Sequence, residues 1–148
     1  MQPKCIWIVV TDGGVCRFLA SEKRNADPTV AMPELSIPNP PTREQGTDKP
    51  GRTFESTGTR RSAYEPPADW HEQAKRDFAR EVAEVLKEKA RNGAFDNLIL
   101  VAPPAMLGNL RPHLSAETKA KLLGEVNKDY TQLTPREIKQ QLSGSYNV

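Results

Sequence analysis

The sequence predicts an α/β domain with a mixed β-sheet of about five strands and helices on its faces. Three observations support this prediction. Three strand-like segments come first, a proline- and glycine-rich stretch then leads into a long amphipathic helix, and short apolar runs alternate with helix signals afterwards. Such alternation is typical of a sheet covered by helices. The chain of 148 residues has the usual size of one domain, so we expect a single domain over residues 1–148.

The first three predicted strands lie in the first quarter of the chain. Residues 5–10 are apolar without interruption, as in a central strand covered on both faces. The glycines within residues 11–14 predict a tight turn, and residues 15–20 predict the returning strand. In that strand we expect Arg17 to point to an open edge. Residues 29–36 contain a proline, which predicts a weaker strand at an edge of the sheet.

A long helix is predicted from residue 69 to about residue 92. Asp69 and Glu72 have the spacing of a capping box, and Gly93 suits the end of a helix. Apolar residues at helical spacing form one stripe, which we expect to face the sheet. The stripe consists of Trp70, Ala74, Phe78, Val82, Val85, Leu86 and Ala90.

The second half of the chain predicts two more strands and three short helices. The apolar run at residues 97–102 is typical of a buried parallel strand, and residues 122–130 hold the last strand. Pro104 and Ser115 mark the beginnings of two helices, because proline suits a first helical position and serine suits an N-cap. Residues 134–137 have the pattern of a capping box, which begins the final helix.

The cysteines and the N-terminal residues bear on where the protein works. Cys5 and Cys16 lie on paired strands at positions that do not face each other, so we expect two reduced, buried thiols. The first apolar run is too short for the core of a signal peptide. No stretch approaches the ~20 apolar residues of a membrane span. We therefore expect a cytoplasmic protein without membrane contact, and the sequence predicts no oligomeric state.

Residues 38–68 form the stretch with the least regular pattern, and we expect a flexible basic loop there. Between residues 42 and 64, five Lys and Arg against three Asp and Glu give a charge of +2, which equals the net charge of the whole chain. Guanidinium groups hold phosphates and aromatic rings stack on unpaired bases, so this loop is a candidate polyanion or RNA site. The alternative is a solvated loop whose charges maintain solubility. The candidate residues are Lys49, Arg52, Phe54, Arg60, Arg61 and Tyr64.

The histidines do not complete a catalytic or metal-binding motif. His71 and Glu72 have the spacing of a zinc-protease helix, but Lys75 stands where that motif needs its second histidine. His113 is the other histidine, and the sequence has no nucleophile elbow to accompany it. The sequence therefore predicts no metal and no cofactor.

The segment Asp12, Gly13 and Gly14 follows the first predicted strand, where ligands bind in many open α/β sheets. It lacks the spacing of glycine-rich phosphate loops and leads into a strand, so we interpret it as a strand-end turn. These features favour a non-enzymatic protein. A phosphoester hydrolase, with Asp12 and the basic loop converging, is the alternative.

Five short blocks spread over the chain carry a family resemblance. They are Trp7–Gly14, Lys49–Phe54, Ala63–Glu65, Phe78–Ala83 and Leu122–Asp129. Together they resemble the bacterial host attachment protein family. This resemblance implies a role in the attachment of bacteria to host cells, and in a cytoplasmic protein that role in cell adhesion would be indirect.

A more distant likeness is to the middle domain of archaeal and eukaryotic class-1 release factors, which implies a ribonuclease H-like topology. In that domain a basic, glycine-rich loop precedes a long helix, and residues 58–63 take this place here. Thr59, Arg60 and Arg61 replace the catalytic Gly-Gly-Gln, so the likeness implies a ribosome, tRNA or other RNA partner without peptidyl-tRNA hydrolysis. The alternative is a protein partner, with the chain acting as an adaptor that regulates adhesion.

Overall fold

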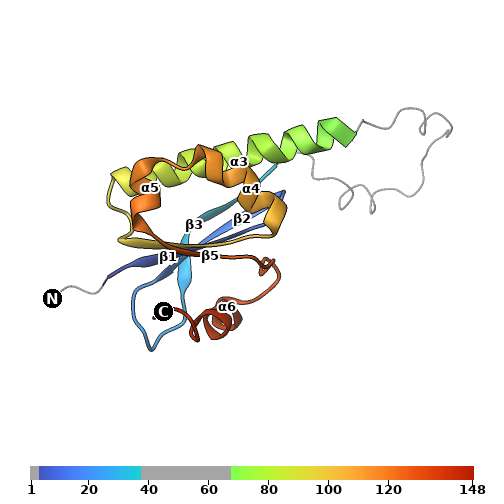
Figure 1. The fold of residues 1–148 in the computed structure, drawn as a ribbon. Coiled ribbons are helices and arrows are strands. Elements are labelled where there is room, and N and C mark those ends of the chain that lie inside the picture. Colours follow the sequence, from blue (N-terminus) through green and yellow to red (C-terminus); the bar gives the residue numbers. More distant parts are fainter. Residues whose placement is uncertain (1–3, 38–67) are drawn as a thin grey trace.

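The computed structural model describes residues 4–37 and 68–148 (Figure 1). Every strand and helix that the sequence predicts in these ranges is present. The strands are β1 (Ile6–Thr11), β2 (Val15–Ser21), β3 (Thr29–Ser36), β4 (Asn97–Val101) and β5 (Leu122–Val126). The helices are α3 (Ala68–Arg91), α4 (Pro104–Leu110), the 3-10 helix η1 (Arg111–His113), α5 (Ala116–Lys121) and α6 (Pro135–Leu142).

The five strands form one mixed sheet in the order β3-β2-β1-β4-β5. β1 pairs in parallel with β4, and β4 pairs in parallel with β5, whereas β2 is antiparallel to both β1 and β3. Only β2 therefore runs against the other strands of this sheet. The predicted α/β class with a mixed five-stranded sheet is confirmed, and this strand order is the expected ribonuclease H-like one.

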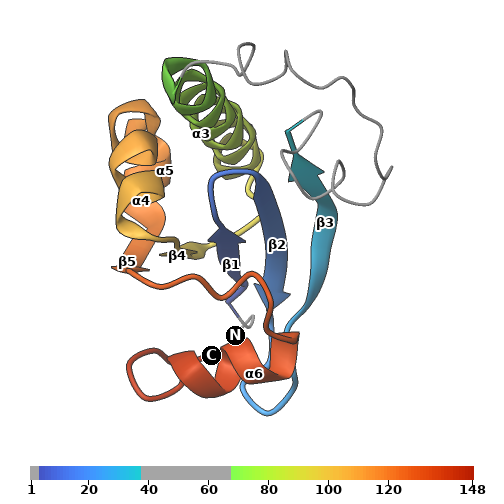
Figure 2. The same cartoon turned by 90° about the vertical axis from the view of Figure 1, so that its right-hand side faces the viewer.

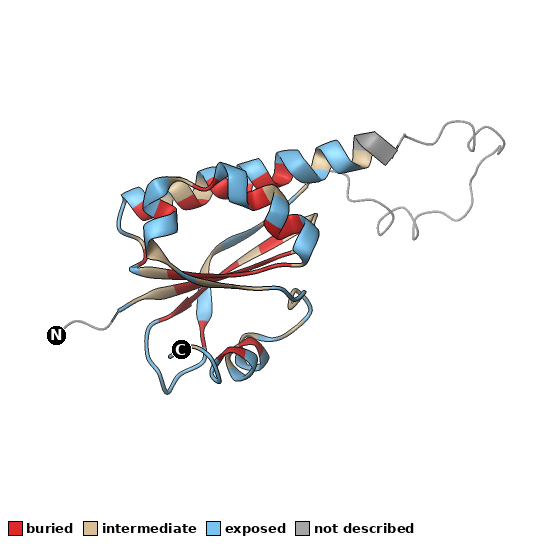
Figure 3. Cartoon of the chain, in the orientation of Figure 1, coloured by how far each residue is buried: buried red, intermediate tan, exposed pale blue. Residues whose placement is uncertain are grey.

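The molecule has three layers, with α3, α4 and α5 on one face of the sheet and α6 on the other (Figures 1 and 2). Successive side chains of a strand point to opposite faces, so the apolar central strands supply two cores. Trp7, Phe18 and Leu100 belong to the core under α3, while Ile8 and Ile99 belong to the core over α6. Buried residues accordingly run through the central strands and along the inner side of the helices (Figure 3).

Both ends of α3 lie within about one residue of the predicted positions. The helix begins at Ala68, one residue before the predicted N-cap Asp69, and the Asp69 side chain with its predicted capping box lies outside the described part of the chain. At the other end Gly93 has a φ of 73°, a conformation that glycine adopts without strain. The amides of Gly93 and Ala94 donate to the carbonyls of Ala90 and Lys89 at 3.2 and 3.0 Å. This Schellman motif confirms the predicted glycine cap.

The predicted caps of the later helices are confirmed. Ser115 Oγ accepts a hydrogen bond from the amide of Thr118 at 3.1 Å, at the beginning of α5. At the beginning of α6, the Glu137 amide donates to Thr134 Oγ1 at 3.1 Å, and the Thr134 amide donates to Glu137 Oε1 at 2.9 Å. These reciprocal bonds form the capping box that the sequence predicted. Among the described residues, no helix is both long and apolar enough to cross a membrane.

Arg17 occupies a place that the sequence did not predict. It lies in β2, which is flanked by β1 and β3, so the prediction that it points to an open edge is wrong. Its guanidinium donates hydrogen bonds to the carbonyls of Thr131 and Leu133 at 3.1 and 2.6 Å. The loop before α6 covers this side chain, which is only 16% exposed. Arg17 therefore fastens that loop to the middle of the sheet.

Gly124 of β5 lies against the ring of Tyr146, and a Cβ there would stand 2.2 Å from the Tyr146 hydroxyl oxygen. We expect Gly124→Ala to lower the free energy of unfolding by about 1–3 kcal/mol, because the ring must move or the strand must shift. Adding Tyr146→Phe should restore part of this loss by removing the nearest atom. Urea unfolding of the single and double variants measures both effects. A Gly124→Ala variant as stable as the parent contradicts the close contact.

Candidate functional site at the β1–β2 turn

The turn between β1 and β2 is held by Asp12. Its Oδ1 accepts hydrogen bonds from the amides of Gly14 and Val15, both at 2.8 Å, and its own amide donates to the Val15 carbonyl at 3.0 Å. Thr11 Oγ1 also donates to that carbonyl at 2.7 Å. A carboxylate that accepts two backbone N–H bonds fixes the backbone of a turn, as the sequence interpretation of this segment required.

Both described segments that border residues 38–67 meet this turn (Figure 2). The amide of Ile37, the last described residue before the gap, donates to the Gly14 carbonyl at 3.0 Å. From α3, the stem of Lys75 lies over Gly13, where an added Cβ would stand 3.2 Å from Lys75 Cδ. Lys75 follows the beginning of α3 by about two helical turns, so the β1–β2 turn contacts both Ile37 and the first half of α3.

The charges on α3 cancel. Residues 68–91 contain six Lys and Arg and six Asp and Glu, so the helix has no net formal charge. Lys75 Nζ lies 3.8 Å from a Glu72 carboxylate oxygen, and Arg80 lies 3.6 Å from Asp77. Exposed pairs of this kind contribute little to stability, but they leave the helix surface without a large positive field.

Cys16 lies next to the turn, because it pairs with Thr11 across β1 and β2. Burial raises the pKa of the Cys16 thiol well above its ordinary value. Cys5 is half-buried, and its pKa is raised by burial and by the nearby Glu22 and Asp96 carboxylates. Both cysteines are free thiols, as predicted, although Cys5 is less buried than expected. Raised pKa values disfavour the reactive thiolate, so neither residue has the character of a nucleophile.

The predicted polyanion-binding residues lie outside the described residues. These are Lys49, Arg52, Phe54, Arg60, Arg61 and Tyr64, together with the whole predicted basic loop apart from its last residue. Asp12, Gly13 and Gly14 are the predicted site residues that the structure describes, and they form the expected strand-end turn. Over residues 4–37 and 68–148, no cluster of three or more His, Cys, Asp or Glu could hold a metal ion.

Two lysines have roles that the sequence did not reveal. In the sequence, Lys75 was notable only because it stands where a zinc-protease helix needs histidine. In the structure, its stem packs on the β1–β2 turn. Lys121 Nζ donates to the carbonyls of Ala90 and Phe95 at 3.3 and 3.0 Å and lies 5.5 Å from the centre of the Phe95 ring. The sequence gives only a weak signal for this bridging role of Lys121, a lysine near a helix end, because the carbonyl of Ala90 that it reaches lies about thirty residues earlier in the chain.

Asp12→Ala should lower the free energy of unfolding by about 1–3 kcal/mol, because two turn amides lose a charged acceptor. Asp12→Asn keeps an acceptor oxygen and should cost less than half as much. Thermal or urea unfolding of both variants measures this difference. If Asp12→Ala leaves stability unchanged, Asp12 does not hold the turn and a role in chemistry becomes the better explanation.

The fold and the turn define a three-layered α/β protein with one mixed five-stranded sheet. The family model described as "Protein required for attachment to host cells" matches residues 7–142 of this sequence. The match covers most of the chain, so the protein belongs to this family, as its sequence blocks indicated. Three of those blocks lie in described parts of the chain, on β1 with its turn, on α3, and on β5 with the residues after it. No curated protein matches the sequence.

Solved structures share the fold at low sequence identity. An archaeal protein is 15% identical, with a TM-score of 0.50 over 97% of this chain and 34% of its own length. An archaeal translation termination factor is 12% identical, with a TM-score of 0.49 over 95% of this chain and 38% of its own length. The present chain thus spans little more than a third of these proteins. The likeness to the archaeal protein concerns the fold alone.

Proposed function

We propose that this protein supports attachment to host cells indirectly, as a non-enzymatic cytoplasmic protein that binds RNA or the ribosome through residues 42–64. Membership of the host attachment family supports the role in attachment. The remaining steps rest on the charge of the segment and on the part of the domain that borders it.

The observation that carries the proposal is the separation of charge along the chain. Residues 42–64 have a charge of +2, while α3, which begins at Ala68, has none. A polyanion is attracted to a segment with an excess of positive charge more strongly than to a surface whose charges cancel. Phe54 and Tyr64 add two aromatic rings that can stack on unpaired bases.

The described domain provides a firm base for such a segment. Ile37 is hydrogen-bonded to the β1–β2 turn, and the stem of Lys75 in α3 packs on the same turn. Phe78 of α3 is buried in the core under that helix. Binding elements attached to a packed scaffold lose less conformational freedom when they meet a ligand than elements in a free chain do. Asp12 contributes to this base and takes no further part.

Protease mapping with and without total RNA tests the proposal. We expect cleavage sites within residues 38–68 to become protected when RNA is present, and the protection to weaken as salt rises because counterions compete for the cations. Cleavage at Lys87 or Lys89 of α3 serves as an internal control. Equal cleavage of the segment with and without RNA at low salt contradicts RNA binding.

A protein partner is the competing outcome, in which the segment orders on a protein and the chain acts as an adaptor that regulates adhesion. Cross-linking in cells, followed by capture of the full chain, distinguishes the two. Ribosomal components among the captured material support the proposal. Capture of other proteins without any ribosomal component overturns it.

A further inference from the structure

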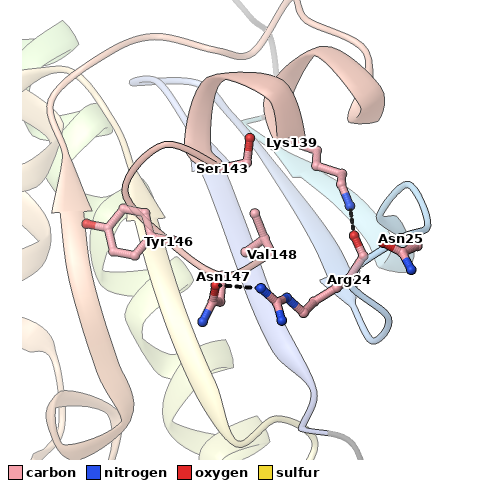
Figure 4. Close-up of a pocket in the computed structure, with 7 residues that line it drawn as sticks. All are labelled: Arg24, Asn25, Lys139, Ser143, Tyr146, Asn147 and Val148. Atoms are coloured by element: carbon pink, nitrogen blue, oxygen red, sulfur yellow. Dashed lines mark hydrogen bonds between the residues drawn. The ribbon is translucent and has the colours of Figure 1, made fainter.

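A cleft of about 320 Å³ lies between the β2–β3 loop and the C-terminal part of the chain (Figure 4). This loop is at the end of the sheet opposite the β1–β2 turn (Figure 2). This volume is near the lower limit of the pockets that hold small molecules. The cleft is separate from the candidate site described above. The residues that line it are Arg24, Asn25, Lys139, Ser143, Tyr146, Asn147 and Val148.

The loop side of the cleft is held in place by α6. Lys139 Nζ donates a hydrogen bond to the main-chain carbonyl of Arg24 (Figure 4). It donates another to the main-chain carbonyl of Ala26 at 3.1 Å. Arg136, one helical turn earlier, lies 3.5 Å from Asp27 of the same loop. A cleft whose walls are tied together before a ligand arrives loses little entropy on binding.

The charged side chains that line the cleft are both cationic. Arg24 and Lys139 each carry a positive charge, and no carboxylate side chain lines the cleft. The nearby Asp27 is paired with Arg136 and offers no compensation to the lining cations. Two cations among hydroxyl and amide groups are suited to a phosphate group rather than to a neutral or cationic ligand.

Donor groups remain available in the cleft. The Lys139 ammonium has three N–H groups and uses two of them on the loop carbonyls. The Arg24 guanidinium donates one hydrogen bond to Asn147 Oδ1 at 3.2 Å, so most of its five N–H groups remain available to a ligand. Because the Asn147 oxygen faces Arg24, the Asn147 amide nitrogen points away from Arg24. The carbonyl of Leu142 at the end of α6 accepts hydrogen bonds from the amides of Ser145 and Tyr146. This carbonyl oxygen is therefore already paired and does not repel an anion in the cleft as a bare acceptor would.

We infer that this cleft binds a small molecule that carries a phosphate group, with Arg24 and Lys139 as its ligands. The volume exceeds that of a phosphate ion, so the occupant would be a small phosphomonoester. This site is independent of residues 42–64 and of the proposed RNA binding.

Amide chemical-shift titration of the full chain tests the inference, with inorganic phosphate, adenosine 5′-monophosphate and adenosine as probes. Both phosphate-bearing probes should shift the amides of residues 24–26 and 143–147 saturably, and adenosine should not. If adenosine 5′-monophosphate binds more tightly than inorganic phosphate, the preferred ligand is a phosphate ester rather than free phosphate. Arg24→Gln should weaken binding about tenfold, as expected for the loss of a charged hydrogen bond. That variant keeps the main-chain carbonyl on which Lys139 anchors the loop.

Lys23→Gln is the matched control, because it removes an adjacent exposed cation that does not line the cleft. It should change the affinity less than twofold. The inference is overturned by an equal effect of Lys23→Gln and Arg24→Gln, by equal shifts with adenosine, or by no shift up to about 10 mM phosphate, where a millimolar site is mostly filled.

Discussion

Phe95→Ala is expected to lower the free energy of unfolding by about 3–5 kcal/mol, the usual cost of emptying a buried phenylalanine site. Phe95 is 1% exposed and lies in the loop that joins α3 to β4. Its ring is 5.1 Å from that of Trp7 in β1, and Lys121 lies over it at 5.5 Å. One side chain thus connects the loop after α3, the central strand β1 and the end of α5.

Phe95→Leu is the matched control, because it keeps an apolar side chain and loses the aromatic contacts. It should cost about 1–2 kcal/mol, clearly less than the alanine variant. Urea unfolding of the three proteins, followed by fluorescence of the neighbouring tryptophan, gives both values. A loss below about 1 kcal/mol in the alanine variant contradicts the packing described here.

Arg17→Met is expected to cost about 2–4 kcal/mol, because two carbonyls of the loop before α6 lose a charged donor. Methionine retains much of the apolar stem, so the loss reports on the guanidinium. Hydrogen exchange should also become faster at residues 129–134, where the loop is fastened, and should change little in α3.

Arg17→Lys separates charge from geometry. Both bonds come from Arg17 Nη1. Lysine keeps the positive charge, but its shorter and more flexible ammonium is not held in the guanidinium plane that directs the two Nη1 N–H groups to Thr131 and Leu133. We expect this variant to recover part of the lost stability. Unchanged exchange at residues 129–134 in Arg17→Met contradicts the fastening role.

The elements that the sequence predicted well are those whose signals are local. Glycine at 93 adopts the positive φ that ends α3, and Thr134 with Glu137 forms the capping box of α6, because caps depend on residues a few positions apart. The apolar runs predicted β1 and β4 because a central strand is buried on both faces. The mixed sheet followed from these elements.

The features that the sequence did not reveal depend on contacts between distant segments. Arg17 was expected at an edge, because nothing in its neighbours shows that residues more than a hundred positions away bring carbonyls to it. The same reason applies to the contacts of Lys75 and Lys121 and to the cleft beside Arg24. Each is formed by segments that are far apart in the sequence. In the candidate site, the Asp12 turn was predicted, whereas its contact with α3 through Lys75 was not.

The central claim is that residues 42–64 bind RNA or the ribosome. Co-sedimentation of the full chain with ribosomes at two salt concentrations tests it most directly, using the parent, Arg52/Arg60/Arg61→Ala, and Arg76/Arg80/Arg91→Ala as a control that removes three exposed arginines from α3. We expect the first triple variant to bind at least about tenfold more weakly and the control to bind like the parent. The salt dependence should fall by about two counterions in the first variant only. A parent that never co-sediments, or a first triple variant that co-sediments as the parent does, contradicts the claim.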